Sequence, residues 1–289
     1  MTVKSPIRSI SFIGLGLIGM SLLQALKRSP LATESAIIFQ GFDPNFTESD
    51  QQCVKELGLD AFMTDKKALY SADLLILSAP VEVNIALLEE IKQFAPPSTL
   101  VSDVSSTKAL IARKARELAL PFIGMHPMAG KEQKGYRESH EELLRDRRVI
   151  FCDDHGLLAS EKGIFLVRLL ESAGCTTISM TPDEHDRVVA RISHLPQLLS
   201  TLLMGYCGES ISTSGPGFAT FTRLAGSSWE IWRDIIATNS NNIAEELDKF
   251  SKELSLLAND VREQNLQQLE LRFSEANRLY QTLKEMNRS

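Results

Sequence analysis

The stretch "ISFIGLGLIGMSLLQAL", residues 10–26, decides the fold class of this chain. It starts like a buried strand and continues with the apolar spacing of a helix. Between the two, three glycines stand in G-x-G-x-x-G spacing, which allows a tight turn, close approach of the backbone to a pyrophosphate and close helix–sheet packing. Glycines used for packing alone are the alternative. The stretch predicts a dinucleotide-binding βαβ unit whose cofactor contacts are Gly14, Gly16, Leu17, Ile18 and Gly19.

Up to about residue 181, short β-rich runs alternate with amphipathic helical stretches. Continuous apolar strands separated by helices indicate a parallel sheet covered on both faces, the doubly wound α/β class. After that the β signal disappears, and "TPDE" has the form of a capping box that opens a helix reaching about Tyr206, with Pro196 as a kink. We therefore expect two domains, an α/β domain over 1–181 and an all-helical domain over 182–289.

The last predicted helix carries two sets of residues that recur every seven positions. Packing within the domain explains so short a seam, and a dimer surface is the alternative. The residues are Leu266, Phe273 and Tyr280, and Leu269, Ala276 and Leu283.

Composition excludes several classes of function. The formal net charge of −6 over 289 residues gives no support for nucleic-acid binding. The apolar stretch at 10–26 is short for a membrane span, and its regular glycines argue against a signal peptide. The cysteines lie far apart and have no metal-ligand spacing, as expected of thiols in a reducing compartment. We expect a cytoplasmic protein that binds no metal, nucleic acid or membrane.

Asp43 ends the second predicted strand, 24 residues after Gly19. An acidic side chain at this place accepts hydrogen bonds from the adenosine ribose. No basic residue that would hold a 2′-phosphate follows until Lys55. The pattern therefore predicts NAD as the cofactor rather than NADP.

Three further strands end in candidate site residues. Small residues follow the first, Ser78, Ala79 and Pro80, and two serines follow the next, Ser105 and Ser106. His126 ends the third, and an imidazole suits the uptake of a proton from an alcohol that loses hydride. Ligands bind at the carboxyl edge of such sheets. A plain turn, a serine helix cap and a satisfied strand-end histidine are the alternatives at the three places.

The helical region holds two candidate substrate ligands. His194 lies in "ISHLPQLL" and Arg223 in "GFATFTRLAG", where a core histidine and a surface arginine are the plainer interpretations. His185 and Asp186, in the first turn after the cap, are interpreted as structural.

The ordered motifs "GLGLIG", "DVSSTK", "HPMAGKE", "SHLPQ" and "GFATFTRLA" cover essentially the whole chain. In this combination the sequence resembles the prephenate and arogenate dehydrogenases of tyrosine biosynthesis. The resemblance implies a Rossmann domain followed by an all-helical dimerisation domain in a homodimer. It also implies NAD-dependent oxidation of prephenate to 4-hydroxyphenylpyruvate with loss of CO2, with arogenate, giving tyrosine directly, as the alternative substrate.

The resemblance implies a role for each site residue. His126 matches the histidine that draws the proton from the ring hydroxyl, and Ser106 the serine that orients both groups. Arg223 matches the arginine that binds a substrate carboxylate. The remaining implied substrate contacts are Glu132, a gating acid; His194, which lines the pocket; and Gln197, where many relatives have histidine.

Two other classes stay open. A β-hydroxyacid dehydrogenase or imine reductase would share the two-domain plan but not the "HPMAGKE" signature. A non-enzymatic NAD sensor would bind the cofactor and oxidise none of these substrates. Lys131 and Lys134, beside Glu132, either shape the entry of a dianionic substrate or belong to a solvated loop surface.

Overall fold

The computed structural model describes residues 5–131 and 133–286. The chain forms two compact units, Met1–Ser240 and Asn241–Ser289. The first unit holds the whole sheet and every described residue predicted for the site. The two units meet after Ser240, not near residue 181, where the sequence predicts the domain boundary. That boundary stays a prediction.

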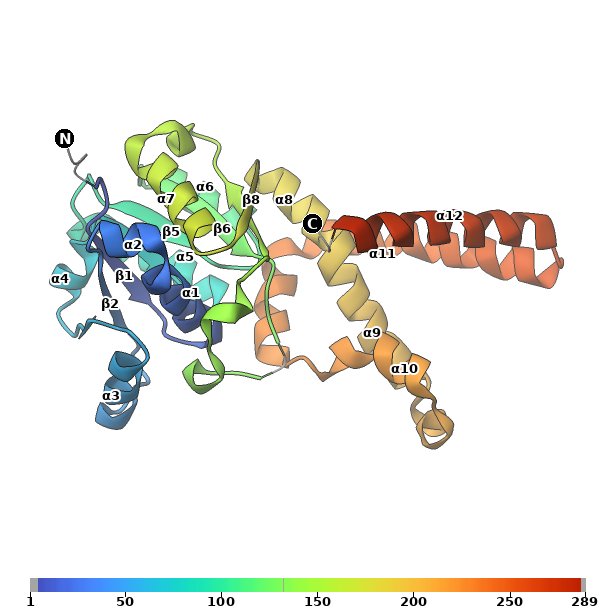
Figure 1. Ribbon diagram of the computed structural model, residues 1–289. Helices are drawn as coiled ribbons and strands as arrows, with labels where there is room; N and C mark the ends of the chain where they lie inside the picture. The colour runs from blue at the N-terminus through green and yellow to red at the C-terminus, as the bar shows by residue number, and fades with distance from the viewer. Residues whose placement is uncertain (1–4, 132, 287–289) are drawn as a thin grey trace. The chain divides into compact units, whose positions relative to one another are not determined.

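An eight-stranded sheet in the order β3-β2-β1-β4-β5-β6-β7-β8 forms the centre of the first unit (Figure 1). The chain leaves β1 toward β2 on one side and later returns to place β4 on the other, so the strand order reverses between β1 and β4. Ligands bind at such a switch point in open α/β sheets. The strands are β1 Ser9–Ile13, β2 Ile38–Phe42, β3 Ala61–Phe62, β4 Leu74–Leu77, β5 Leu100–Asp103, β6 Phe122–Pro127, β7 Arg148–Cys152 and β8 Thr176–Met180.

Helices cover both faces of this sheet because its central strands are apolar on both sides. In β4, Leu74 and Ile76 belong to the core beneath α1 and α7, and Leu75 and Leu77 belong to the core beneath α5 and α6. The doubly wound prediction is therefore confirmed. The helices of this layer are α1 Leu17–Arg28, α2 Pro30–Glu34, α3 Glu48–Glu56, α4 Lys66–Tyr70, α5 Val81–Phe94, α6 Ala109–Glu117 and α7 Glu161–Ser172.

Two strands, β7 and β8, run opposite to the other six and so depart from the predicted parallel arrangement. β7 runs antiparallel to β6, with His126 opposite Ile150, whereas every other neighbouring pair is parallel. The segment between β6 and β7 contains, among its described residues, only the short 3₁₀ helices Tyr136–Glu138 and Glu141–Leu143. A right-handed crossover needs a longer helix packed on the sheet, so the chain returns antiparallel.

The helix predicted after the cap is present, but its middle forms a π-helical turn. Thr181 Oγ1 accepts the Glu184 N–H at 3.2 Å, and α8 (Pro182–Val189) continues through a π-helical turn, Ala190–His194, into α9 (Leu195–Tyr206). The π turn ends two residues before Pro196, which cannot donate a backbone hydrogen bond. The first unit ends with α10 (Pro216–Phe221) and the start of α11 (Trp229–Arg262).

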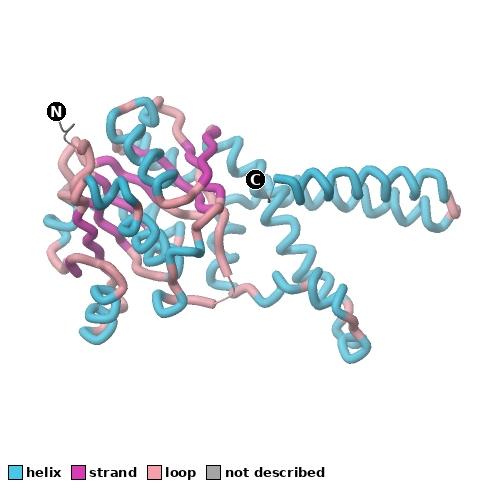
Figure 2. The backbone as a smooth tube through the Cα atoms, in the orientation of Figure 1, coloured by secondary structure: helices cyan, strands magenta, loops and turns pink. Residues whose placement is uncertain are grey.

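The second unit is an antiparallel helical hairpin made by the end of α11 and by α12 (Leu266–Met286), visible as two adjacent cyan helices in Figure 2. Arg272 of α12 pairs with Glu253 and Asp260 of α11, each at 3.2 Å. Along the predicted seam, Leu266, Phe273, Tyr280 and Leu283 are 53–73% exposed. The interpretation that this seam packs within the domain is therefore wrong for these residues.

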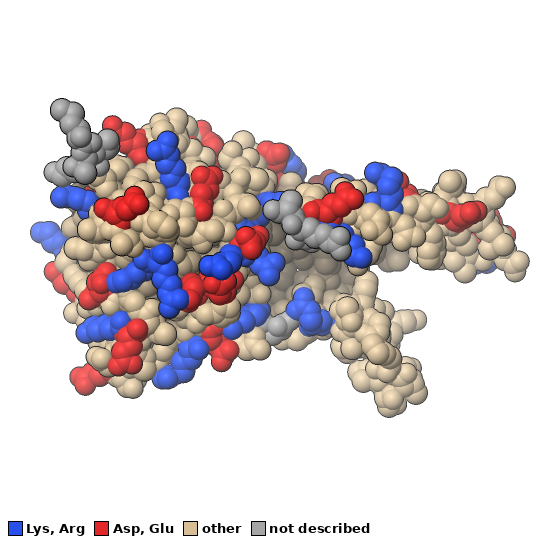
Figure 3. All heavy atoms as spheres, in the orientation of Figure 1, with Lys and Arg blue, Asp and Glu red and all other residues tan. Residues whose placement is uncertain are grey.

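The surface charges, the hydropathy of the helices and the cysteines bear on the expectations drawn from composition. Basic and acidic side chains are intermixed over the sheet-bearing part of the face drawn in Figure 3. Within the described ranges, no helix is both long and apolar enough to cross a bilayer. All four cysteines carry free thiols.

Candidate active site

The loop after β1 has the shape that a dinucleotide requires. Gly14 has φ of +90°, and a Cβ there would lie 2.6 Å from Ala79 N; a Cβ on Gly19 would lie 2.5 Å from Gly14 O. Both positions therefore need glycine to pack the loop against the end of β4. Gly16, the N-cap of α1, has open space around its Cβ position. A pyrophosphate can approach the backbone and the helix N-terminus there.

Asp43 and Ser78 hold this loop from two sides. Asp43 Oδ2 accepts the Leu15 N–H at 3.0 Å, and Oδ1 accepts the Asn45 N–H at 3.0 Å. Each carboxylate oxygen keeps a further lone pair for a ribose hydroxyl. The Ser78 hydroxyl donates to Gly14 O at 2.6 Å. Its side chain thus supports the loop, in addition to the predicted cofactor contact.

Asn84 in α5 is a site residue that the sequence interpretation missed. Its buried Nδ2 donates to Ala79 O at 2.8 Å and to Ser105 Oγ at 3.0 Å, and its Oδ1 accepts the Ala79 N–H at 3.2 Å. One amide therefore ties the carboxyl ends of β4 and β5 together, next to Pro80 and Ser106. The available signal was an asparagine within the buried stripe that Leu88 and Ile91 continue.

His126 lies at the end of β6, 8% exposed, and its Nδ1 is 2.8 Å from His185 Nε2 in α8. His185 Nδ1 is in turn 2.8 Å from Asp186 Oδ1. His185 and Asp186 are almost fully buried. The structural interpretation of these two residues therefore misses that His185 contacts the predicted base and that Asp186 contacts His185.

Burial makes the site histidines hard to protonate. Desolvation lowers the pKa of His126 well below 6.5, and the nearby His185, Lys108 and His194 add to the effect. Desolvation also lowers the pKa of His185, against the opposing effect of Asp186, and lowers that of His194 to about 4. His126 is therefore neutral at pH 7, the state that a proton acceptor requires.

His194 lies in the π-helical turn beside the same network. Its Nδ1 is 3.4 Å from Asn239 Nδ2, its ring meets that of Trp232 edge-on at 5.7 Å, and its Nε2 is buried with no hydrogen-bond partner among the described residues. Asn239 also donates to Asp186 O at 2.8 Å. An unsatisfied buried nitrogen is costly, so a polar ligand group at this place would be stabilised.

The other predicted substrate residues have different surroundings. Gln197 is buried, and its amide donates to Leu224 O at 2.7 Å and accepts from the Ser227 hydroxyl at 3.1 Å, so it already has structural partners. Arg223 is exposed at the start of a 3₁₀ turn, and Ser106 is half-buried. The predicted gating acid, Glu132, lies outside the described residues.

Lys131 and Lys134 each form an ion pair with a glutamate of the chain. Lys134 Nζ lies 3.0 Å from Glu230 Oε2, at the start of α11, and Lys131 Nζ lies 3.6 Å from Glu138 Oε2. Of the two interpretations, these ion pairs favour a solvated loop surface over a role in substrate entry.

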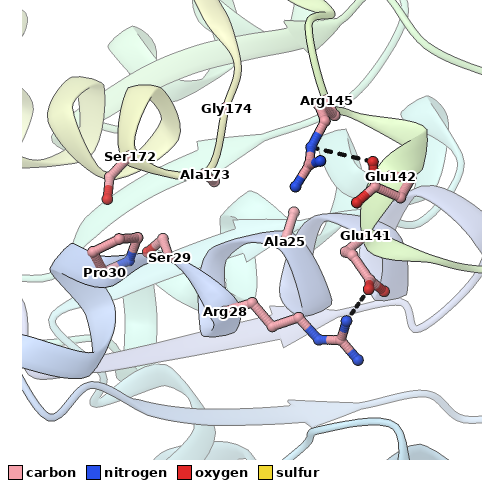
Figure 4. A pocket seen from close by; sticks show the side chains of 10 residues that line it. All are labelled: Ala25, Arg28, Ser29, Pro30, Glu141, Glu142, Arg145, Ser172, Ala173 and Gly174. Atoms are coloured by element: carbon pink, nitrogen blue, oxygen red, sulfur yellow. Dashed lines mark hydrogen bonds and ion pairs between the residues drawn. The ribbon is translucent and has the colours of Figure 1, made fainter.

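A cavity of about 250 Å³ lies away from the strand ends, beside α1, the start of α2 and the end of α7 (Figure 4). Arg28 pairs there with Glu141, and Arg145 pairs with Glu142 at 3.1 Å. None of the predicted site residues lines it. Its charges already have partners, so it lacks the chemistry of the strand-end site.

Known families match the chain over both halves. The nucleotide-binding domain of prephenate dehydrogenase matches residues 34–175, and its dimerization domain matches residues 181–275. A prephenate dehydrogenase from Bacillus subtilis (strain 168) is 30% identical over 281 residues, covering 90% of this chain and 72% of that protein. The chain belongs to the prephenate dehydrogenase family.

Solved structures of this family have the same fold. Prephenate dehydrogenase from A. aeolicus, in complex with hydroxyphenyl propionate and NAD+, has a TM-score of 0.85 at 26% identity, covering 96% of this chain and 98% of that one. Synechocystis arogenate dehydrogenase has a TM-score of 0.80 at 26% identity, with 93% and 97% covered. The predicted family and fold class are confirmed, while the role of each site residue stays a prediction.

Proposed function

We infer that this chain is an NAD-dependent dehydrogenase that oxidatively decarboxylates prephenate to 4-hydroxyphenylpyruvate. The observation that carries this inference is the neutral, buried His126 at the carboxyl edge of the sheet, with its Nδ1 held by His185 at 2.8 Å. Family membership and the open space at Gly16 support it.

The predicted residues would form the cofactor site. The glycine loop and the N-terminus of α1 would hold the pyrophosphate, and Asp43 would accept the ribose hydroxyls. Ser78, Ala79, Pro80 and Ser105 would line the nicotinamide end, where Asn84 holds Ala79 and Ser105. When bound, NAD+ supplies the acceptor for the hydride that leaves the carbinol carbon of the substrate.

The chain's own residues accept the proton and bind the substrate. His126 Nε2 takes the proton as the ring O–H bond breaks and its electrons form the carbonyl. The C–CO2 bond then breaks, and its electrons make the ring aromatic and leave a phenolate oxygen, which takes a proton. Ser106 orients the hydroxyl, Arg223 binds a carboxylate as a bidentate ion pair, and Glu132 and His194 border the substrate.

Arogenate is the alternative substrate, because the chain is 26% identical both to the Synechocystis arogenate dehydrogenase and to the A. aeolicus prephenate dehydrogenase. Prephenate and arogenate differ in the side chain, a keto acid against an amino acid. Gln197 stands where many relatives have histidine, and its amide is committed to Leu224 and Ser227. The Bacillus subtilis relative, at 30% identity, is a prephenate dehydrogenase, so we place prephenate first.

We also propose a cytoplasmic homodimer formed through the helical residues 182–289. The family match over 181–275 is to a dimerization domain, and the apolar seam of α12 is exposed in the single chain. The free thiols agree with a reducing compartment.

Steady-state kinetics with prephenate and arogenate, each with NAD and NADP, test the function. We expect the largest kcat/KM for prephenate with NAD. NADH binding without oxidation of either substrate would instead support a sensor, and turnover of β-hydroxyacids alone would support that class of dehydrogenase. The His126→Asn variant should bind NADH normally and lose about 10²–10⁴-fold in kcat. Near-wild-type turnover by this folded variant would remove His126 from the mechanism.

A further inference from the structure

Three buried side chains form a line that ends at the predicted base. His126 Nδ1 is 2.8 Å from His185 Nε2, and His185 Nδ1 is 2.8 Å from Asp186 Oδ1. His126 comes from β6, and the other two residues from the first turns of α8. The proposed mechanism uses only the near end of this line, so the far end requires its own explanation.

The Asp186 carboxylate acts as an acceptor on every side that the structure describes. Its Oδ1 accepts the Lys108 N–H at 2.7 Å, and its Oδ2 accepts the Ala109 N–H at 2.9 Å. These amides lie at the N-terminus of α6, whose first N–H groups have no partner within the helix. Asp186 therefore caps α6 from a different element, and the helix dipole favours its negative charge.

This acceptor sets the hydrogen-bond direction along the whole line. Since Asp186 Oδ1 accepts, His185 Nδ1 carries a hydrogen. Neutral His185 then has a bare Nε2, which accepts a hydrogen from His126 Nδ1. A neutral imidazole carries only one ring hydrogen, so His126 Nε2 is left as a lone pair.

We propose that His185 and Asp186 are positioning residues that hold His126 as its Nδ1–H tautomer, with Nε2 free to accept the substrate proton. The inference rests on the proposed function, because it names Nε2 as the atom that reacts. Without the His185 acceptor, the buried Nδ1–H would lack a partner. The hydrogen would then be more stable on Nε2, where it blocks proton uptake.

The same line serves the charged state. When the substrate O–H bond breaks and the N–H bond forms at Nε2, His126 becomes an imidazolium with hydrogens on both nitrogens. Its Nδ1–H still donates to His185 Nε2, now as a stronger, charge-assisted bond. His185 stays polarised by the Asp186 carboxylate, so the developing charge is stabilised without movement of any side chain.

Two substitutions at His185 separate this role from simple packing. His185→Leu removes the acceptor and keeps an apolar side chain of similar size, while His185→Gln can place its amide oxygen near the former Nε2. Both variants lose the hydrogen bond from the His185 imidazole to Asp186, since neither leucine nor glutamine has the imidazole N–H. We expect His185→Leu to lower kcat about 100-fold or more with both KM values nearly unchanged, and His185→Gln to recover most of that loss.

Ring ¹⁵N chemical shifts of histidine-labelled protein report the tautomer without any turnover. In the wild type we expect His126 to carry its hydrogen on Nδ1, and in His185→Leu to shift it toward Nε2. A wild-type His126 protonated at Nε2 would overturn the proposal even if the Leu variant does not fold. Equal losses of kcat in both variants, or no loss in a folded Leu variant, would overturn it as well.

The proposed function fails by a different result. A wild type that oxidises neither prephenate nor arogenate would remove the reaction, while the ¹⁵N spectra would still show whether His185 sets the tautomer of His126. An active wild type with an unaltered tautomer in His185→Leu would remove only the positioning role.

Discussion

Lys108 Nζ lies 2.5 Å from Asp103 Oδ2, and neither side chain has any exposed surface. Asp103 ends β5 and also accepts the Ser105 N–H at 3.0 Å, so the ion pair holds the loop that carries the two site serines. Gly124 in β6 leaves room for it, because a Cβ there would lie 2.8 Å from Lys108 Cδ. The buried charge pair therefore spans the serine loop from Asp103 to Lys108 and packs against β6 at Gly124.

Breaking this pair should be strongly destabilising. Lys108→Met leaves the Asp103 carboxylate buried and uncompensated, so we expect the free energy of unfolding to fall by about 3–5 kcal/mol in urea titrations. Adding Asp103→Asn should recover part of the loss. Lys66→Met, which breaks an exposed pair with Glu90, is the control and should cost about 1 kcal/mol or less. A similar small cost for Lys108→Met would contradict the role of the buried pair.

The glycine loop offers a test that separates ligand binding from folding. Gly16→Ala fills open space at an ordinary φ of −75°, so its melting temperature should stay near that of the wild type. Its Kd for NADH should rise about 10-fold or more, because the methyl group enters the space assigned to the pyrophosphate. Gly19→Ala would meet Gly14 O and should lower both stability and affinity. Unchanged NADH affinity in Gly16→Ala would place the cofactor elsewhere.

Acid should destabilise the folded chain below pH 6.5. The pKa values of His126, His185 and His194 are lowered on folding, that of His194 from 6.5 to about 4. The unfolded chain therefore binds more protons as pH falls below 6.5. The stabilisation that the three neutral histidines contribute is complete above pH 6.5. It is lost as the pH falls toward their pKa values in the folded chain. Each histidine contributes about 1.4 kcal/mol per pH unit within that window.

Urea titrations between pH 7 and 5 measure this slope. His194→Gln should reduce it by about one proton, because one titrating group is removed. The matched control is His155→Gln, at a histidine whose side chain is 41% exposed, which should leave the slope as in the wild type. The same slope in all three proteins would show that His194 does not carry the effect.

The exposed seam of α12 should control assembly. Phe273 is 72% exposed, and a glutamate in its place would bring a charge into a buried dimer interface. We expect Phe273→Glu to shift the protein from dimer to monomer in light scattering coupled to size exclusion. Ser274→Glu adds the same charge beside the seam and should stay dimeric. A dimeric Phe273→Glu variant would place the interface on another surface.

Local patterns predicted most of the fold. Short continuous apolar runs marked the strands, and the glycine spacing marked the turn at Gly14–Gly19, because both signals act over a few neighbouring residues. The antiparallel β7 was missed, since strand direction depends on what packs between two strands and not on the strand sequence. The sequence left both packing within the domain and a dimer surface open for the α12 seam, because the seven-residue period is the same in the two cases.

The site shows the same division. Strand ends placed Ser78, Ser106 and His126 at one edge, because parallel strands end together. Asn84 was overlooked, since a single polar residue in an apolar stripe gains meaning only when its amide reaches two other strand ends.

By itself, the sequence determined the doubly wound class, the glycine loop and the identity of the predicted base, because periodicity and motif spacing are local properties of the chain. Only the tertiary structure decided the environment of that base. His126 and His185 are 59 residues apart, and their 2.8 Å contact exists because α8 packs against the N-terminus of α6 through Asp186. Hydrogen-bond direction and burial are properties of that packing, and they make His126 a neutral imidazole with one free nitrogen.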